Sequence, residues 1–551
     1  MIRIRPNLLM LILGIFTTVT FFSTAAYGQR QSFEEDVRKR AAIYKESGKL
    51  SAGDQMLYGA GLTLHMVELD GFNPLWNEKN TQALLAAIDG LDKDGLKPEE
   101  YRFPELDDLL KAQKTGDMPV SAQVDLDFLL SEAYLRAVYN LAFGKVDAVS
   151  LDPDINFTRP IRAEDPAREL LKYIKKGKIT DAFELSRPQN PRYGEMKKAL
   201  AQYREIQAAG GWKSIDKGPT LKAGQTDPRV AQLRDRLYVT GDGPAPSSLK
   251  GDLQVFDDAL VAAVKRFQER HGLEVDGAVG PSTLADLNVP VEARIDQIRV
   301  NLERQRWILH EVHGNFLVAD IAGFKLYWVE DNKIIWEEKI QVGKYYTKTP
   351  LFKSDINRIV FNPDWTIPPG ILRRSIIPNI KKDPGYLDQK GYLLLTQDGR
   401  RVDPKKVDWT SLKGFPYIVR QPPGPDNALG QVKFLFPNPH HVFLHDTNHR
   451  ELFDRTSRTF SSGCIRLLNP FDLAEGLLDD QDGWNRERID RTIASGITAN
   501  VNLKNPMRIV IAYGTATVRD GRVNFRPDIY KRDPALLEAL DGPFKVRKQD
   551  L

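Results

Sequence analysis

Hydrophobic and polar positions follow two different periods along the chain. In the first part, apolar residues recur at three- and four-residue steps within charged segments such as 128–143, which predicts amphipathic helices from about residue 29 to residue 218. After residue 295, short β-branched and aromatic runs, several of them alternating, predict strands. These candidate strands cover 316–321, 325–329, 334–342, 358–361, 442–445 and 507–513. We therefore expect a multi-domain α+β protein in which a helical scaffold precedes a β-rich domain.

A short helical unit separates these two regions. Val230, Leu233 and Leu237 would form one helix face, and a second apolar face follows Asp257, a candidate helix cap. Gly272 would end the second helix, because glycine readily adopts the left-handed conformation found after helix ends. The pattern predicts a small, compact helical module.

The length of 551 residues is too great for one hydrophobic core, so several domains are expected. A segment rich in Pro, Gly, Lys and Asp interrupts the β-rich part and is too long for a simple connection, which makes it a candidate lid. The predicted units are an export segment (1–28), a helical scaffold (29–222), the module (223–290), the β-rich domain (291–535) with its lid (370–425), and a C-terminal tail (536–551).

The first residues indicate export. Arg3 and Arg5 precede an apolar stretch over 8–22, and the sequence Ala-Tyr-Gly at 26–28 supplies small residues at the two positions that a signal peptidase reads. The stretch is also near the lower limit of the roughly 20 residues that a spanning helix needs, so an uncleaved membrane anchor is the alternative. Both interpretations place the body of the protein outside the cytoplasm, in the periplasm.

Composition and charge narrow the choice of partner only slightly. The chain is 41% hydrophobic and 28% charged, with 78 Lys and Arg against 74 Asp and Glu and a formal net charge of +4. This balance gives no support for nucleic-acid binding, and it is compatible with an anionic polymer as substrate. Protein partners cannot be identified from the sequence.

Cysteine usage is unusual for an exported protein, because Cys464 is the only cysteine. It cannot form an internal disulfide. In an oxidising compartment a lone thiol suggests either deep burial or use as a nucleophile.

The surroundings of Cys464 favour a nucleophile. His445 lies nineteen positions earlier, at the end of a predicted strand that would hold an imidazole rigidly as a general base. Gly463 would let the backbone turn sharply, so that the N–H groups of Gly463 and Cys464 could stabilise an oxyanion. Arg466 could bind a substrate carboxylate, with a structural ion pair as the alternative.

A metal site is the rival interpretation of the same region. His441, His445 and His449 recur every four residues beside His440, and histidines at this helical spacing can bind zinc. The preceding run looks like a strand, the glutamate of the HExxH motif is missing, and a second cysteine is absent. We therefore expect no metal and no cofactor.

The module resembles the peptidoglycan-binding domain type 1 family. The resemblance depends on Val-Lys-Arg-Phe-Gln at 264–268, Gly-Leu at 272–273, and Asp-Gly-x-Val-Gly-x-x-Thr-Leu at 276–284. It implies binding of the wall polymer, and a spacer without a ligand is the alternative.

The β-rich domain resembles the L,D-transpeptidase catalytic domain, and specifically its large, multi-domain periplasmic branch. The matching motifs are His-Asp-Thr at 445–447, Ser-Ser-Gly-Cys-Ile-Arg at 461–466, Gly343 with Thr-Pro-Leu-Phe at 349–352, Asn-Pro-Asp-Trp at 362–365, Ile-Pro at 367–368, Gln-Pro-Pro-Gly-Pro-Asp-Asn-Ala-Leu-Gly at 421–430 and Lys-Phe at 433–434. Smaller members usually carry histidine where Ser462 stands, and often an aromatic hydroxyl where Phe443 stands. Ser461, Ser462, Phe443 and Trp365 are further candidate substrate-binding residues.

This resemblance implies a reaction. The Cys464 thiolate, generated by His445, would attack the carbonyl before the terminal D-alanine of a donor tetrapeptide stem, and a side-chain amine of an acceptor stem would attack the thioester to give a 3-3 cross-link. It also implies roles in cell-wall organisation and cell shape, and acylation by carbapenems. A cysteine carboxypeptidase or endopeptidase on the same fold, and an inactive wall-binding scaffold, are the alternatives. The acceptor, whether a stem, a free D-amino acid or a protein lysine, stays open.

Overall fold

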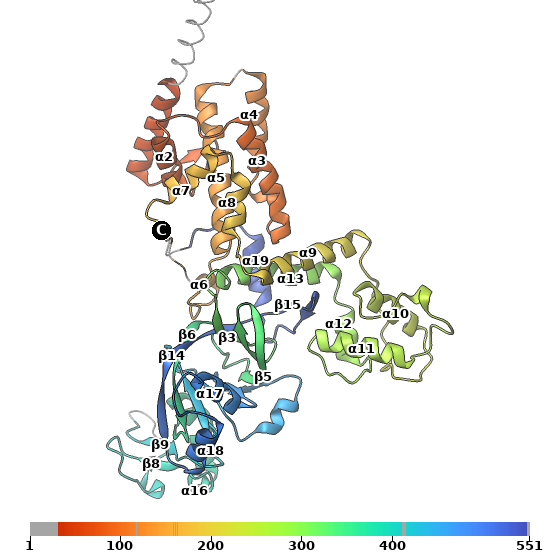
Figure 1. Ribbon diagram of the computed structural model, residues 1–551, viewed down its shortest axis with the longest axis vertical. Coiled ribbons are helices and arrows are strands. Elements are labelled where there is room, and N and C mark those ends of the chain that lie inside the picture. The colour runs from red at the N-terminus through yellow and green to blue at the C-terminus, as the bar shows by residue number, and fades with distance from the viewer. Residues whose placement is uncertain are drawn as a thin grey trace, which may run out of the picture.

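The computed structural model describes residues 31–116, 118–157, 159, 161, 163–409 and 415–547. Its helical region, small module and β-rich domain form three arms (Figure 1). The predicted export segment, residues 410–414 of the predicted lid and the end of the predicted tail lie outside the described residues. Within the described ranges, no helix has the length and apolar character needed to cross a membrane.

The first arm is helical, as predicted, and surrounds the long helix α5. The middle of α5 is almost wholly buried, because apolar residues cover most of its circumference and neighbouring helices pack on several sides. A helix over 31–47 and a two-stranded hairpin, β1 (Ser51–Ala52) and β2 (Gln55–Met56), open the region. The other helices are α2 (Ala60–Leu69), α3 (Glu78–Asp89), η1 (Gly90–Asp94), η2 (Pro98–Glu100), α4 (Pro104–Thr115), α5 (Val120–Phe143), α6 (Ala148–Leu151), α7 (Pro166–Lys175), α8 (Ile179–Ser186) and α9 (Pro191–Ala208).

The second arm is the predicted module, with its own core. Val230, Leu233 and Leu237 are fully buried on one face of a helix, and the Asp257 carboxylate caps the next helix by accepting the Leu260 N–H at 2.8 Å. Gly272 takes a φ of 64° just after that helix, the conformation expected of it. The helices are α10 (Arg229–Val239), η3 (Pro246–Ser248), α11 (Asp258–Arg270) and α12 (Pro281–Leu287).

The third arm contains a nine-stranded sheet in the order β12-β5-β13-β11-β10-β6-β14-β3-β4. Strand β5 also pairs with β4, so eight of the strands close into a barrel and β12 branches off the far end of β5. The strands are β3 (Asn315–Asp320), β4 (Lys325–Glu330), β5 (Lys333–Gly343), β6 (Lys353–Phe361), β10 (Val432–Leu435), β11 (Leu444–His445), β12 (Thr459–Ser461), β13 (Ile465–Leu467) and β14 (Ala499–Ala512).

Helices and one hairpin surround this sheet. They are α13 (Val291–Ile308), η6 (Arg450–Asp454), α17 (Pro470–Leu478), α18 (Arg486–Ala494), α19 (Asp533–Asp541) and the hairpin of β15 (Ala516–Arg519) with β16 (Arg522–Phe525). The hairpin buries Val518, Val523 and Phe525 against α9 and α13. The predicted start of the tail, at residue 536, lies inside α19, whose Leu536 and Leu540 are buried in the main core.

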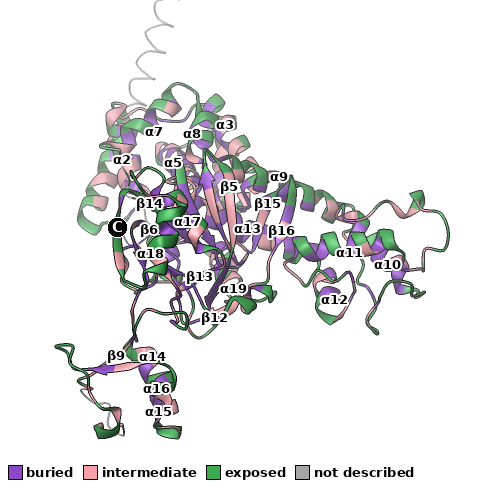
Figure 2. Ribbon diagram, turned by 60° about the horizontal axis from the view of Figure 1, so that its bottom comes forward, coloured by how far each residue is buried: buried purple, intermediate pink, exposed green. Residues whose placement is uncertain are grey.

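The segment predicted as a lid forms a subdomain with its own sheet and core. Its sheet has the order β7-β9-β8, and Ile376, Ile377, Leu387, Leu394 and Val419 are buried in its centre. Figure 2 shows β9, α14, α15 and α16 standing apart from the rest of the third arm. The elements are β7 (Trp365–Thr366), α14 (Pro369–Ile371), η4 (Leu372–Ile376), α15 (Ile377–Lys382), α16 (Tyr386–Gln389), β8 (Leu393–Leu395), η5 (Pro404–Lys406) and β9 (Ile418–Gln421).

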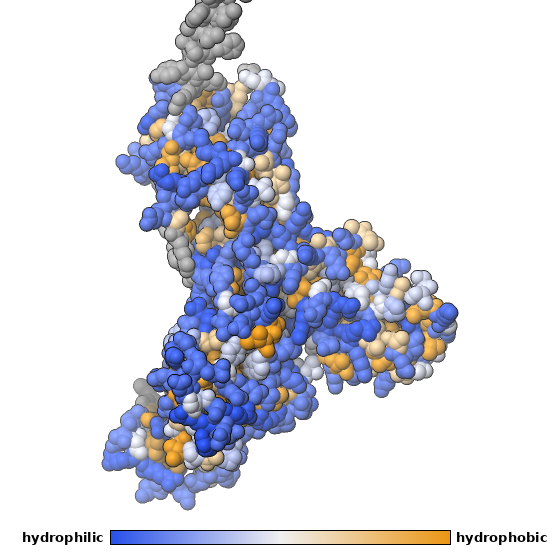
Figure 3. All heavy atoms as spheres, viewed as in Figure 1, coloured by the Kyte–Doolittle hydropathy of each residue, from blue (hydrophilic) through white to orange (hydrophobic). Residues whose placement is uncertain are grey.

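The outer surface shows no dominant apolar face on the side drawn in Figure 3. Hydrophilic side chains prevail over all three arms, and hydrophobic ones occur in small, separate groups.

Candidate active site

Two short parallel strands bring the predicted nucleophile and base to one face of the sheet. Strand β11 pairs with β13 in the register Leu444 to Ile465 and His445 to Arg466, and the Ile465 N–H donates to the Phe443 carbonyl at 3.1 Å. Side chains alternate along a strand, so Leu444 and Ile465 enter the core, where both are fully buried. Cys464, one residue before Ile465, consequently shares the opposite face with His445 and Arg466.

A row of polar side chains crosses four strands on this face. Lys433 of β10 pairs with His445, and Gln341 of β5 pairs with Arg466, so directly opposed residues place their side chains on one side of the sheet. Arg466 Nη1 donates to Gln341 Oε1 at 3.3 Å. The row contains two cations, and among the described residues neither Lys433 nor Arg466 has a carboxylate at ion-pair distance. These two positive charges therefore favour the binding of an anionic substrate group.

Arg466 is the most informative member of this row. Its Nε is buried and has no hydrogen-bond partner among the described residues. Burial lowers the pKa of its guanidinium, and the nearby Cys464 opposes that effect. A buried N–H donor without an acceptor costs about 1–3 kcal/mol, which a bound carboxylate would recover. This observation favours the substrate-binding interpretation of Arg466 over a structural ion pair.

Hydrogen bonds fix the loop that carries Cys464. Ser461 Oγ donates to the Cys464 carbonyl at 2.5 Å, and Thr349 Oγ1 donates to the Gly463 carbonyl at 2.9 Å. Thr349 Oγ1 also accepts the Gly343 N–H at 2.9 Å, and the Tyr530 hydroxyl donates to the Gly343 carbonyl at 2.6 Å. Sequence reasoning missed Tyr530, because this tyrosine is separated from the loop by more than sixty positions and belongs to no motif. Buried bonds from three chain segments thus hold the loop in one shape.

Gly463 has a φ of 126°, a conformation in which an L side chain would be strained. Its N–H donates to Ser461 Oγ at 3.1 Å. Of the two N–H groups predicted to stabilise an oxyanion, the one on Gly463 is therefore occupied in this conformation. The N–H of Cys464 has no acceptor among the hydrogen bonds of the described residues.

His445 is buried and neutral. Its Nδ1 lies 2.5 Å from the Asp446 carbonyl, and a carbonyl oxygen only accepts, so Nδ1 carries the proton and Nε2 carries the lone pair. Burial first, and then the positive charge of Arg466, lower the pKa of His445 to about 3. Burial and the Arg466 charge thus favour the neutral imidazole, against the smaller opposing effects of backbone hydrogen bonds to Asp446 and Leu429.

Cys464 is a half-buried free cysteine. Burial raises its pKa to about 11, against the smaller opposing effects of the Phe443 backbone and the Arg466 charge. The sulfur lies 3.8 Å from the His441 carbonyl, and no hydrogen bond to His445 occurs among the described contacts. These pKa shifts favour a neutral thiol and a neutral imidazole before substrate binds, and the thiolate implied by the family resemblance belongs to the reaction step.

The other predicted substrate-binding residues divide into two groups. Ser461 is buried in the loop, Ser462 is exposed beside it, and the Phe443 ring lies 5.5 Å from the imidazole of His445 between ring centres. Trp365 lies elsewhere, in strand β7 of the lid, where its ring packs edge-on against Tyr392 at 6.2 Å. The structure thus brings three of these four residues to the cysteine, and the family motif around Trp365 gave no sign of its distance.

The histidine-rich segment does not assemble a metal centre. Within the described ranges, no group of three or more His, Cys, Asp and Glu side chains could hold a metal ion. His440 packs against Phe352 at 5.4 Å, and His449 is exposed beside Glu451.

Comparison with family models matches three stretches of the chain. Residues 68–200 match a scaffold domain, residues 226–287 a “Putative peptidoglycan binding domain”, and residues 314–478 an L,D-transpeptidase catalytic domain. The last stretch contains Cys464, His445 and Arg466.

Comparison with known proteins gives one curated relative and eight solved chains, of which two are described here. A protein of Haemophilus influenzae named “Putative L,D-transpeptidase” is 35% identical over 244 residues, which are 44% of this chain and 49% of that protein, so the chain spans about half the length of the relative it matches. An L,D-transpeptidase structure from Xylanimonas cellulosilytica is 16% identical and covers 54% of this chain and 99% of its own, with a TM-score of 0.18. A fused Zn-dependent amidase/peptidase/peptidoglycan-binding protein from Clostridium acetobutylicum is 13% identical and covers 54% and 100%, with a TM-score of 0.15.

At such TM-scores the two solved chains carry no argument. The family models and the curated relative carry the assignment, and the fold agrees with it in the order and type of its three arms. Residues 314–478 therefore form an L,D-transpeptidase catalytic domain, preceded in the chain by a scaffold domain and a peptidoglycan-binding module in the order predicted from the sequence.

Proposed function

We propose that this chain is a peptidoglycan L,D-transpeptidase that forms 3-3 cross-links through a thioester on Cys464. The observation that carries the proposal is the shared sheet face of Cys464, His445 and Arg466, whose buried Nε has no hydrogen-bond partner among the described residues, inside the stretch that matches the L,D-transpeptidase domain. A nucleophile, a base and a carboxylate receptor are the three groups that acyl transfer from a stem peptide requires.

In the first half-reaction the thiol proton passes to His445 Nε2 as the sulfur attacks the carbonyl carbon before the terminal D-alanine. The neutral imidazole suits this step, because its lone pair is free at neutral pH. The N–H of Cys464 stabilises the oxyanion. When the tetrahedral intermediate collapses, the C–N bond breaks, and D-alanine leaves with the proton that His445 returns to its amine.

In the second half-reaction the side-chain amine of an acceptor stem attacks the thioester. His445 takes a proton from that amine, the C–S bond breaks, and the thiol is restored. Because the cycle needs only proton transfer and acyl exchange, the residues present suffice for it. Arg466 binds the carboxylate of the donor stem and so places the scissile carbonyl near the sulfur.

The lid supports transfer to an amine over hydrolysis. A subdomain with its own core can move as one body over the site and exclude water from the thioester. Without that protection water would take the acyl group, and the enzyme would act as a carboxypeptidase. Trp365, in a lid strand, would contact the substrate only when the lid approaches.

The test is analysis of the products formed from tetrapeptide-containing muropeptides by the unaltered protein and by Cys464→Ala. Cross-linked dimers and a Cys464 acyl adduct are expected only with the thiol, and a carbapenem should add once to the same residue. Loss of D-alanine without dimers would replace the proposal by a carboxypeptidase. No reaction and no adduct would replace it by a wall-binding scaffold. Domains that act on peptidoglycan imply a location at the cell wall or in the periplasm.

A further inference from the structure

A cavity of about 910 Å³ lies where the module meets the catalytic domain, away from the cysteine. Its walls come from the end of α11 and the turn after it (266–275), from α13, from β3 and β4, from the β15–β16 hairpin and from the segment 453–458. None of Cys464, His445 and Arg466 lines it. Its size is that of sites which hold drug-sized molecules, so it is large enough for part of a muropeptide.

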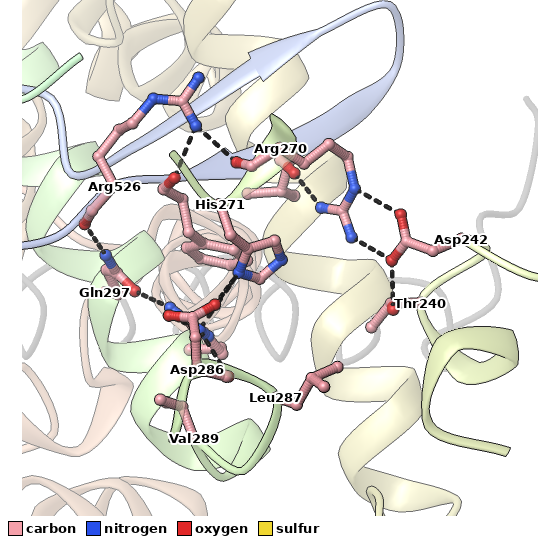
Figure 4. A network of polar contacts seen from close by, with 12 residues as sticks. Thr240, Asp242, Arg270, His271, Asp286, Leu287, Val289, Gln297 and Arg526 are labelled. Atoms are coloured by element: carbon pink, nitrogen blue, oxygen red, sulfur yellow. Dashed lines mark hydrogen bonds and ion pairs between the residues drawn. The ribbon is translucent and has the colours of Figure 1, made fainter. Parts of the chain in front are cut away.

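Hydrogen bonds connect the module to the catalytic domain around this cavity. Figure 4 shows side chains of the module meeting residues of the catalytic domain in one polar network. Arg270 contacts the Asp242 carboxylate within the module and donates to the Val523 carbonyl of the hairpin, and Arg526 Nη1 donates to the Arg270 carbonyl at 2.6 Å. Gln297 of α13 donates to the Arg526 carbonyl at 3.1 Å. The cavity walls are therefore held at fixed separation.

The cavity lining is strongly basic. Eleven Lys and Arg residues line it against six Asp and Glu, while the whole chain has a net charge of only +4. Arg455 and Arg522 are exposed at its edge, and Arg458 is partly buried. In the part of the chain that the structure describes, no carboxylate lies at ion-pair distance from any of these three guanidinium groups. Positive potential focused between low-dielectric walls attracts anions.

Arg458 is a cavity cation that has no carboxylate partner among the described residues. Its guanidinium donates to the carbonyls of Ile340, Arg455 and Phe324 at 3.0–3.1 Å, so its hydrogen bonds are satisfied while its charge has no counter-ion. Burial lowers its pKa to about 10, which shows the cost of that unbalanced charge. A bound carboxylate would supply the missing negative charge.

Apolar surface lies beside these cations. Phe316, Tyr327 and Ile334 line the cavity from the sheet, and Val275 of the module is 49% exposed although it is aliphatic. Aromatic and aliphatic walls next to arginines suit a ligand with both apolar faces and carboxylates. Simple inorganic anions would leave the apolar wall unused.

We propose that this cavity binds a carboxylate-bearing stem peptide of the wall polymer, and so holds a strand at a second site while Cys464 reacts elsewhere. The choice of occupant rests on the proposed function and on charge complementarity. Arg455 and Arg458 lie directly before β12, whose Ser461 hydrogen-bonds the Cys464 carbonyl, so the occupied cavity adjoins the chain segment that enters the cysteine loop. The module then contributes one wall of a composite site.

The test measures binding of a fluorescent disaccharide-tetrapeptide to the full chain carrying Cys464→Ala, which cannot turn it over. Reversal of two exposed cavity cations, in Arg455→Glu with Arg522→Glu, should weaken binding at least tenfold. The matched control, Lys222→Glu with Lys250→Glu, reverses two exposed cations on the module away from the cavity and should leave the dissociation constant within twofold. Amidation of the peptide carboxylates should weaken binding to the unreversed chain by a similar factor.

A second measurement guards against misfolding of the double variant. Hydrogen exchange in the unreversed chain should slow over 453–458 and 516–525 when the muropeptide is added. The proposal would be overturned if the arginine double variant kept its affinity or if only the lysine double variant lost it. Absence of muropeptide binding, or of protection in these two segments, would also overturn it. Carbapenem acylation of the arginine pair with its thiol intact should proceed at the unaltered rate, so failure of the chemistry is distinguished from failure of the cavity site.

Discussion

The neutral state of Cys464 can be tested by alkylation, because the chain has one cysteine and every adduct is assigned without ambiguity. At pH 7, the thiolate fraction of a cysteine with a pKa of about 11 is roughly 300-fold smaller than that of a cysteine with a pKa of about 8.5. A more basic thiolate is a better nucleophile, and this raises the rate constant of each thiolate about tenfold, which offsets part of the loss. We therefore expect iodoacetamide to react about 30-fold more slowly with the native protein than with the same chain in concentrated urea.

The pH dependence is the sharper part of this prediction. The alkylation rate should rise about tenfold per pH unit between pH 7 and pH 10, because only the thiolate reacts and its fraction grows in that proportion below the pKa. The assay is intact-mass spectrometry after timed quenching. A plateau that begins below pH 8 and disappears in His445→Gln would refute the reasoning, since it would reveal a resting thiolate–imidazolium pair.

Three substitutions test the loop and its neighbours. Thr349→Val removes the hydroxyl that bridges the Gly343 N–H and the Gly463 carbonyl, and urea unfolding should show a loss of about 1–3 kcal/mol; an unchanged midpoint would mean that the bridge is dispensable. Gly463→Ala forces an alanine to a φ of 126°, so the free energy of unfolding should fall by about 1–3 kcal/mol. Acylation by a carbapenem should also become slower, and an unchanged rate would show that the loop relaxes at no cost. Arg466→Met removes the charge that lowers the pKa of Cys464, so alkylation at pH 8 should become slower, and the KM for a tetrapeptide should rise at least tenfold; equal loss for a peptide amidated at its carboxylates would contradict the carboxylate contact.

Sequence patterns predicted the components of the site better than their electrostatics. The parallel pairing of β11 with β13 brings His445 and Cys464 to one face, as the motifs around each suggested. Lys433 and Gln341 reach the same row from strands far away in the sequence, and only the strand order makes them neighbours. The burial that raises the pKa of Cys464 could not be predicted, because a local motif does not reveal how many atoms from other segments exclude water.

The fold shows the same division. Helical spacing predicted the long helix around 128–143 and the module, since these depend on local periodicity. The lid could be predicted from its high content of Pro, Gly, Lys and Asp. Its separate sheet could not, because that sheet depends on the pairing of Trp365 with Gln421, more than fifty positions apart. The junction cavity arises from segments spread from α9 to the β15–β16 hairpin, and the family motif at the end of α11 gave no sign that it would form one wall of a cavity.

The contact between Tyr530 and Gly343 has a consequence for how the protein matures. The Tyr530 hydroxyl reaches the strand end beside the cysteine loop, and Lys145 of the first arm donates to the Leu540 carbonyl at 2.6 Å. During synthesis from the amino end, both the helical arm and the reactive loop therefore gain these contacts only after the segment around 530–540 has been made. The hydrogen bond that supports this loop therefore depends on a segment close to the end of the described chain.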